Sequence, residues 1–497
     1  MSKKNENSNF LDFLFKPKTI AIYGASEKSK HFIGGLKIQG FNKNKIYLIN
    51  PSKEELFGLK VYKSLKEIPE DAIDHLIITI RREKLVESLK EIFSQKKINT
   101  IHIFTAGTGE FDEKGLKIEK EIKIMLDQGK LKTRIIGPNC MGCYCPKGHM
   151  AYLKSFPKKS GNIGLIFQSG DLHTRLIKFG NLRYDLRFSK GVSIGNTLDL
   201  QVSEVLDYFN NDEETDIIAV YFEGFSTFHP NEGKNLLKTL KTMKKPVLFM
   251  RGGETKRGQT AVLTHTGTIG TKQRIWDAIF KQTSIIKVPT SLDSILDYIY
   301  IFYMFINRYK KLGYNFNEIP YPTGKNTLLI LWSGGFGILA TDTLTKLGLN
   351  LPIFKGEILE KLRKIFPIKI GSFSNPLDLP WIESSKEYLE ISKATISENI
   401  DLVIIETDVT SNFKQSKNFK AYYSNINKIK EFVESLNKVL ILILYQYPSP
   451  NRKEYYDMLI KDGFIVYPTL PQAAKAYLAL YGYGVKVKSL KNKQMHN

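Results

Sequence analysis

A histidine in a glycine-rich stretch is the residue of this chain best suited to covalent chemistry. His265 lies in Thr264-His265-Thr266-Gly267, downstream of the apolar run Pro246–Met250. A neutral imidazole nitrogen is nucleophilic near pH 7, and the N–P bond that it forms is labile enough to pass a phosphoryl group onward. On a loop that joins a strand to a helix, the free N–H groups of the helix start would hold an anion. We therefore interpret His265 as a candidate phosphoryl carrier.

Such a carrier needs a hydrogen-bond acceptor for its second ring nitrogen and donors for the phosphate. Glu223 ends a predicted strand, and its carboxylate would fix the imidazole tautomer and support a cationic phosphohistidine. Backbone N–H groups at Ser169-Gly170 and Asn139-Cys140 are the candidate donors. Taken singly, His265 also fits a structural or solvent-exposed turn, and Glu223 fits an ordinary polar strand end.

The elements that position these residues follow from hydrophobic patterning. From Thr19 onward, short apolar runs alternate with amphipathic stretches, which predicts a parallel sheet covered by helices on both faces. The first strand ends in Gly24-Ala25-Ser26, a turn that lacks the full dinucleotide-binding spacing. The second ends in Asn50-Pro51, where a NAD site would place an acid, so the pattern favours coenzyme A over NAD. The predicted strands of this block are Thr19–Gly24, Lys45–Ile49, His75–Ile80, Thr100–Thr105 and Thr133–Ile136.

Two further alternating blocks follow in the chain. Ligands of open α/β sheets bind beyond the carboxyl ends of strands, so the second block brings Ser169, Asn196, Glu223 and His265 to one edge. A connector rich in Tyr, Pro and Asn, 313–326, precedes the third block. The predicted strands are Gly164–Phe167, Phe188–Ser193, Asp216–Phe222, Val247–Met250 and Ser284–Val288, then Leu328–Trp332, Asp401–Glu406, Val439–Leu444 and Phe464–Val466.

Bulk properties exclude several classes of protein. The formal net charge is +23, but the lysines are spread over every predicted helix beside acidic residues, so we expect no nucleic-acid partner. The start of the chain carries no secretory signal, and the apolar run 295–306 is too short for a membrane span, which predicts a cytoplasmic protein without a membrane partner. The cysteines Cys140, Cys143 and Cys145 are expected to be reduced thiols, and no metal site is predicted.

The order of the motifs carries more information than any one of them. Together they resemble the α subunit of ADP-forming acetyl-CoA synthetases, which belong to the succinyl-CoA synthetase-like acyl-CoA ligases. The resemblance covers nearly the whole chain and extends through Gly334–Gly337 and Asn375–Asp378. Its motifs are Gly24-Ala25-Ser26, Asn50-Pro51, Ala106-Gly107, Gly137-Pro138-Asn139-Cys140, Gln168-Ser169-Gly170, Ser193-Ile194-Gly195-Asn196, Glu223-Gly224 and Thr264-His265-Thr266-Gly267.

The resemblance implies an α/β fold with a CoA-binding Rossmann-like domain followed by two flavodoxin-like parallel-sheet domains. The boundaries expected are 1–155, 156–312 with the phosphohistidine loop, and 325–486, with a tail at 487–497. It implies phosphorylation of His265 with help from Glu223. Contacts to CoA are expected from Gly24, Ala25, Ser26, Asn50, Pro51, Ala106 and Gly107, and contacts to phosphate from Gly137, Pro138, Asn139, Cys140, Ser169, Gly170, Ser193, Gly195 and Asn196.

The resemblance also implies what a partner must supply. In this family ADP and Mg²⁺ bind an ATP-grasp module, so a separate ATP-grasp β subunit and an α₂β₂ assembly are expected. The reaction implied is acyl-CoA + ADP + phosphate ⇌ carboxylic acid + CoA + ATP, with acetate or a related acid. The alternative is an inactive CoA-responsive regulatory or binding protein, which gains from Thr108-Gly109-Glu110 standing where a bulkier, often aromatic residue is usual.

Overall fold

The computed structural model describes residues 10–128, 132–266, 273–367, 372–396, 399–408 and 414–495 of the chain. These residues form two compact units, Met1–Leu296 and Asp297–Asn497. Strands of the described residues form three sheets, all mainly parallel. The predicted α/β class is therefore confirmed.

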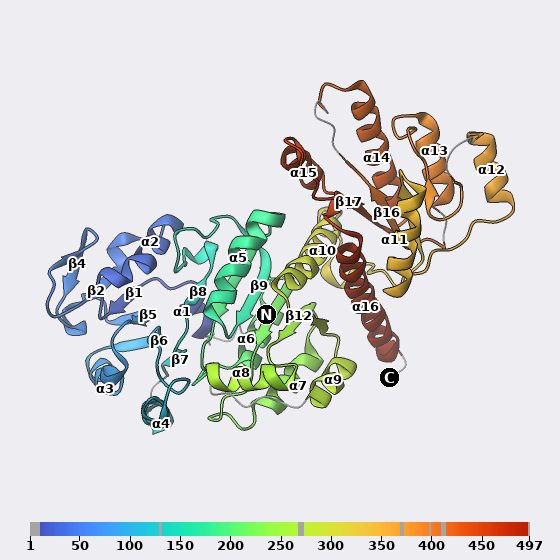
Figure 1. The fold of residues 1–497 in the computed structure, drawn as a ribbon. Coiled ribbons are helices and arrows are strands. Elements are labelled where there is room, and N and C mark those ends of the chain that lie inside the picture. The colour runs from blue at the N-terminus through green and yellow to red at the C-terminus, as the bar shows by residue number, and fades with distance from the viewer. Residues whose placement is uncertain are drawn as a thin grey trace, which may run out of the picture. The chain divides into compact units, whose positions relative to one another are not determined.

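The first sheet has the strand order β3-β4-β2-β1-β5-β6-β7 (Figure 1). Its strands pair in parallel, except that β3 is antiparallel to β4. Strand order reverses between β1 and β5, and ligands of such sheets bind at this switch point. The strands are β1 Ile20–Tyr23, β2 Ile46–Ile49, β3 Glu55–Leu56, β4 Leu59–Tyr62, β5 Ala72–Ile78, β6 Lys97–Ile103 and β7 Arg134–Ile136, and the helices are α1 Phe10–Phe15, α2 Lys30–Gln39, α3 Leu85–Gln95 and α4 Glu113–Gln128.

The second sheet has the order β13-β12-β11-β9-β10-β8, with β8 antiparallel to β10. Without β8 this is the flavodoxin-like order, and its switch point lies between β9 and β11. Right-handed crossovers then place α5 and α6 on opposite faces. The strands are β8 Gly142–Tyr144, β9 Ser160–Phe167, β10 Phe188–Ser193, β11 Ile217–Phe222, β12 Val247–Arg251 and β13 Ile286–Val288, and the helices are α5 Gly170–Tyr184, α6 Val202–Asn211, α7 Glu232–Thr242, α8 Lys256–Thr266 and α9 Gln273–Gln282.

The third sheet repeats the flavodoxin-like order as β15-β14-β16-β17-β18. Its core includes Leu328, Val403 and Leu442 from the strands, packed against helix residues such as Tyr388 and Ile426. Helix α16 continues to Met495, through residues that the sequence predicts as a tail. The strands are β14 Thr327–Leu331, β15 Leu377–Asp378, β16 Leu402–Glu406, β17 Val439–Ile443 and β18 Ile465–Tyr467, and the helices are α10 Leu292–Lys311, α11 Gly334–Lys346, α12 Glu357–Ile365, α13 Lys386–Thr395, α14 Lys417–Ser435, α15 Arg452–Lys461 and α16 Leu470–Met495.

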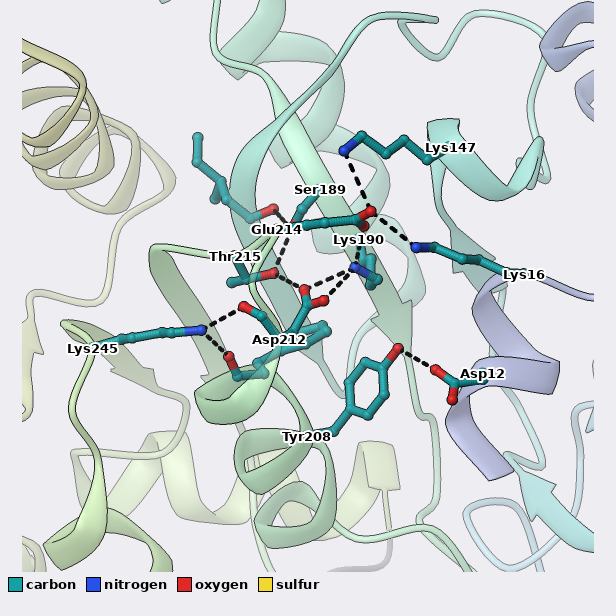
Figure 2. A network of polar contacts seen from close by, with 12 residues as sticks. Asp12, Lys16, Lys147, Ser189, Lys190, Tyr208, Asp212, Glu214, Thr215 and Lys245 are labelled. Atoms are coloured by element: carbon teal, nitrogen blue, oxygen red, sulfur yellow. Dashed lines mark hydrogen bonds and ion pairs between the residues drawn. The ribbon is translucent and has the colours of Figure 1, made fainter. Parts of the chain in front are cut away.

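A buried lysine links the N-terminal segment to the second sheet (Figure 2). The Lys190 side chain is fully buried and binds both oxygens of Asp212, at 2.9 and 2.8 Å, and Glu214 at 2.6 Å. Glu214 also accepts from Lys16, just after α1, at 2.9 Å. Burial raises the pKa of Glu214, but the bonds from Lys190 and Lys16 outweigh burial and lower it to about 2. These contacts help the first two sheets to form one unit.

The described helices include none that is both long and apolar enough to cross a bilayer.

Candidate active site

A cleft of about 780 Å³ opens between the first and second sheets, where the carboxyl ends of their strands meet. Both switch points contribute to it, because residues that follow β5 and residues that follow β9 line the same space. Eight of the predicted binding residues are among those that line the cleft, namely Ala106, Gly107, Asn139, Cys140, Ser169, Gly170, Gly195 and Asn196. The other predicted residues in the described part of the chain lie outside this lining.

The turn Gly24-Ala25-Ser26 after β1, predicted to contact CoA, packs against a residue that lines the cleft. Gly24 has φ 79°, and a Cβ there would lie 2.4 Å from Ile80, a residue of the lining. Asn50 donates from Nδ2 to the Ala25 carbonyl at 2.8 Å. This hydrogen bond shows that the Asn50 side chain stabilises the turn after β1. The next residue, Pro51, is exposed.

The loop after β6 forms one wall of the cleft. Gly107 has φ 81°, and its carbonyl accepts from Arg82 Nη1 at 2.5 Å. Arg82 is fixed in turn by Asp112, with bonds of 3.0 and 2.9 Å, and stacks over the exposed Phe111. Asp112 and Glu83 raise the pKa of Arg82. A fixed guanidinium thus borders the predicted CoA residues.

The turn 137–140 forms the floor, together with the end of β10. Asn139 has φ 58°, and its N–H donates to the Thr105 carbonyl at 3.0 Å. The Asn196 N–H donates to the Pro138 carbonyl at 3.0 Å, and the Met141 N–H donates to Ser193 Oγ at 3.3 Å. Backbone contacts therefore join the two predicted phosphate motifs directly.

Helix α5 points its N-terminus into the cleft. Ser169 is the N-cap residue, and its Oγ accepts from the Leu172 N–H at 3.3 Å. Ser169 and Gly170 both line the cleft, so the positive end of a 15-residue helix faces it. A Cβ on Gly170 would lie 2.4 Å from the Met141 side chain, which leaves no room for a larger residue. This helix start is suited to an anion.

Glu223 is buried at the end of β11, across the switch point from β9. Gln168 Oε1 accepts from the N–H groups of Glu223 and Gly224, and its Nε2 donates to the Gly224 carbonyl at 2.9 Å. Burial and then the Glu223 carboxylate raise the pKa of Tyr221. Gln168 also lines the cleft, so one side chain connects the cleft with the position of Glu223.

The segment around His265 differs from the expected loop. Residues 256–266 form helix α8, and His265 lies in its last turn. The side chain of His265 and the residues Gly267 and Gly270 lie outside the described residues. The sequence predicted a flexible turn because Gly252, Gly253 and Gly258 precede His265, but the run from Lys256 also holds enough helix-forming residues for three turns.

Asn196 lies in a buried polar cluster beside the cleft. Its Nδ2 is 2.6 Å from Glu110 Oε2, 2.8 Å from Glu119 Oε1 and 3.2 Å from Thr108 Oγ1. Glu119 is only 4% exposed, and burial, to which the neighbouring Glu110 adds, raises its pKa. The cluster joins the loop after β6, helix α4 and the end of β10.

Sequence reasoning missed several residues of the cleft. A basic pair, Arg81-Arg82, directly follows the predicted strand His75–Ile80, whose counterpart β5 ends two residues earlier at Ile78. Lys28 and His31 follow the turn after β1. Charged residues directly after a strand of the switch point were a usable signal for the basic pair. Phe104 and Phe111 carried no such signal, because isolated aromatic residues are common in any chain.

Comparison with known proteins adds to this geometry. Residues 18–146 match a family model described as a CoA binding domain, and residues 160–302 match one described as a succinyl-CoA ligase like flavodoxin domain. The α subunit of acetate–CoA ligase [ADP-forming] II from Pyrococcus furiosus is 30% identical over 95% of this chain and 97% of its own. The chain belongs to this family of ligase α subunits. Family membership places it among the acid–thiol ligases.

A longer relative and a solved structure are also similar to this chain. Acetate–CoA ligase [ADP-forming] of Methanocaldococcus jannaschii is 34% identical over 74% of this chain, which spans about half, 49%, of that longer protein. A solved structure, a dinucleotide-forming acetyl-coenzyme A synthetase 1 of Ca. Korarchaeum cryptofilum in complex with phosphate and ADP, matches with a TM-score of 0.76 and 25% identity. That match covers 97% of this chain and 98% of the other.

Proposed function

We propose that this chain is the CoA-binding, phosphohistidine-bearing subunit of an ADP-forming acyl-CoA synthetase. The reaction is acyl-CoA + ADP + phosphate ⇌ carboxylic acid + CoA + ATP, with acetate or a related acid. The observation that carries the proposal is the cleft, which gathers Ala106-Gly107 from the predicted CoA set with Asn139-Cys140 and Ser169-Gly170 from the predicted phosphate set. Arg81, Arg82 and Lys28 add positive charge suited to a polyphosphate ligand.

The chemistry divides into three transfers. A phosphate oxygen attacks the thioester carbonyl, which releases CoA and leaves an acyl phosphate. A His265 ring nitrogen then attacks phosphorus, so the carboxylate leaves and phosphohistidine forms. ADP takes the phosphoryl group from His265 and becomes ATP. A covalent carrier lets two separate sites share one intermediate.

The residues of this chain have distinct proposed roles. The start of α5 at Ser169-Gly170 stabilises phosphate charge through its N–H groups and helix dipole. Glu223 accepts from the second nitrogen of His265 and supports its cationic form. Gln168 and Tyr221, which contact Glu223 or its backbone, keep the carboxylate in place. Coenzyme A and phosphate are thus the ligands of this chain.

A separate ATP-grasp β subunit is proposed to hold ADP/ATP and Mg²⁺, in an α₂β₂ assembly. A relative that is the α subunit of its ligase matches this chain along nearly its whole length, which supports a partner of this kind. Helix α8 would present His265 to the cleft and to the partner in turn.

The test is ATP formation by the reconstituted complex. With an ATP-grasp partner, acetyl-CoA, ADP and phosphate, the wild type should form ATP, His265→Asn should form none, and Glu223→Gln should be slower by about 100-fold. The control is Lys346→Met, a change at an exposed residue of the second unit, which should keep the wild-type rate.

Two outcomes would contradict this proposal. If CoA stabilises the protein thermally but no acid and no partner gives turnover, the chain is a CoA-responsive binding protein. If His265→Asn keeps the wild-type rate, the carrier is another residue.

A further inference from the structure

The orientation of the Asn196 side chain is fixed by its neighbours. Asn196 is 5% exposed and lines the cleft, with Nδ2 at 2.6 Å from Glu110 Oε2 and 2.8 Å from Glu119 Oε1. Glu119 Oε1 also accepts from the Gly109 N–H at 3.0 Å, so this oxygen is an acceptor and does not donate to Asn196. The amide nitrogen must therefore face the two acids, and the amide oxygen must face away from them.

A count of hydrogens shows what Asn196 can offer a ligand. An amide nitrogen carries two hydrogens, and the two shortest contacts of Nδ2 use both. The remaining polar atom, Oδ1, accepts from Asn139 Nδ2 only at a long 3.4 Å. An amide oxygen has two lone pairs, so Oδ1 can accept a further hydrogen bond from a ligand in the cleft that Asn196 lines.

This acceptor does not suit the phosphate role that the sequence predicts for Asn196. The unprotonated oxygens of phosphate are acceptors and are repelled by an amide oxygen. Two acidic side chains, Glu110 and Glu119, adjoin the same group and add to the repulsion. The start of α5, with its N–H groups, is the better place for the anion.

A ligand at Asn196 must instead donate a hydrogen bond. Coenzyme A, the ligand of the proposed function on which this inference rests, has two amide N–H groups in its pantetheine arm. We propose that Asn196 Oδ1 accepts a hydrogen bond from a pantetheine amide N–H of coenzyme A, and that Glu110 and Glu119 are the positioning residues that hold Asn196 in this orientation.

Thr108 and Gly109 complete the support for this group. Thr108 Oγ1 lies 2.9 Å from Glu110 Oε2 and 2.8 Å from Glu119 Oε1, and the Gly109 N–H donates to Glu119 Oε1 at 3.0 Å. A Cβ on Gly109 would lie 2.4 Å from Glu119 Oε2. The small residues at 108 and 109 therefore make room for the two acids that orient Asn196.

The first experiment compares ligands with and without the arm by calorimetry. Adenosine 3′,5′-bisphosphate lacks pantetheine, so its affinity should be the same for the wild type and Asn196→Ala. Coenzyme A should bind Asn196→Ala about 3- to 10-fold more weakly, the effect of one lost hydrogen bond. The affinity for inorganic phosphate should not change. The matched control is Asn425→Ala, since Asn425 is a buried asparagine of the second unit that donates to the carbonyls of Glu383 and Ser385.

The second experiment changes the ligand, so it does not depend on the folding of Asn196→Ala. Two coenzyme A analogues each replace one amide N–H of the arm with an ester oxygen. One of them should bind the wild type about 3- to 10-fold more weakly than coenzyme A. Glu110→Ala should lose this preference, whereas Glu110→Gln should keep it because its amide oxygen still accepts from Asn196.

The outcomes distinguish a failure of this inference from a failure of the proposed function. If the wild type binds no coenzyme A, the proposed function fails and this inference fails with it. If the wild type binds coenzyme A but both ester analogues bind equally well, only the role of Asn196 is overturned. The role of Asn196 is likewise overturned if Asn196→Ala weakens phosphate binding and leaves coenzyme A binding unchanged.

Discussion

Buried ionisable side chains give this protein measurable pH dependence at the scale of single residues. Glu232, at the start of α7, is 3% exposed and accepts from the N–H and Oγ of Ser203. Burial raises its pKa from 4.5 to about 7. The buried Lys190 instead forms ion pairs with two acidic partners, Asp212 and Glu214. Replacing Glu232 with a neutral residue should therefore raise stability at high pH, whereas replacing Lys190 should lower stability.

Glu232→Gln should make the protein more stable at high pH. The folded pKa lies above the unfolded one, so wild-type stability falls as pH rises from 4.5 to about 7. Above pH 7 the buried carboxylate costs roughly 3 kcal/mol that the glutamine does not, because Gln can accept from the Ser203 N–H and donate to its Oγ. Urea unfolding at pH 5 and pH 8 measures this difference, and an equal effect at both values would contradict it.

Lys190→Met should destabilise the first unit by about 3–5 kcal/mol, because Asp212 and Glu214 lose the cation that compensates them. Thermal unfolding should show a lower midpoint for this variant. Lys346→Met is the control: this lysine is 78% exposed and lies 3.6 Å from Asp342, so the change should cost less than about 0.5 kcal/mol. Similar losses in the two variants would mean that the buried network contributes little.

Residue types in turns were predictable from the sequence, but their partners were not. Ser169 and Asn139 were both expected around one phosphate, and both line the same cleft. It could not show that Arg82 is fixed by Asp112, which follows it by 30 positions. Nor could it show the orientation of Asn196. The two acids that determine it, Glu110 and Glu119, lie in the loop after β6 and in helix α4, whereas Asn196 follows β10 of the second sheet.

At the scale of elements, the cleft depends on close backbone approach between turns. Gly195 has φ 56°, and a Cβ there would lie 2.2 Å from the Pro138 carbonyl oxygen. That contact holds the end of β10 against the turn after β7. A side chain at 195 would therefore displace both predicted phosphate motifs.

Gly195→Ala should cost about 3 kcal/mol of unfolding free energy and abolish coenzyme A binding, through backbone strain together with the clash. Gly58→Ala is the matched control, since Gly58 also has positive φ, 70°, but its Cβ would meet nothing within 4 Å. It should cost about 1 kcal/mol and leave coenzyme A affinity unchanged. Unfolding and calorimetry on both variants measure the contrast, and normal binding by Gly195→Ala would disprove the close-packing argument.

Most buried strands were predictable from their apolar runs, and every strand that the sequence indicated is present. The strands β3, β4, β8 and β15 were not predicted, since glycine or charged residues interrupt the apolar residues of each. Helix α8 was also missed, because its glycine and threonine residues are typical of turns.

At the scale of the whole molecule, two switch points of one unit face a common cleft. In the proposed function, a CoA arm and a phosphate meet there for acyl transfer. The boundaries proposed from the sequence, at 155/156 and between 312 and 325, stay predictions. The third sheet repeats the topology of the second in a separate compact unit.

In the proposed function, His265 carries a phosphoryl group between this cleft and a partner's nucleotide site. The most direct measurement is incubation of the complex with ATP labelled at the γ-phosphate, followed by peptide mapping. The proposed function predicts an acid-labile label on His265 of the wild type, removed by coenzyme A and acetate together, and none on His265→Asn. Equal labelling of His265→Asn would contradict it.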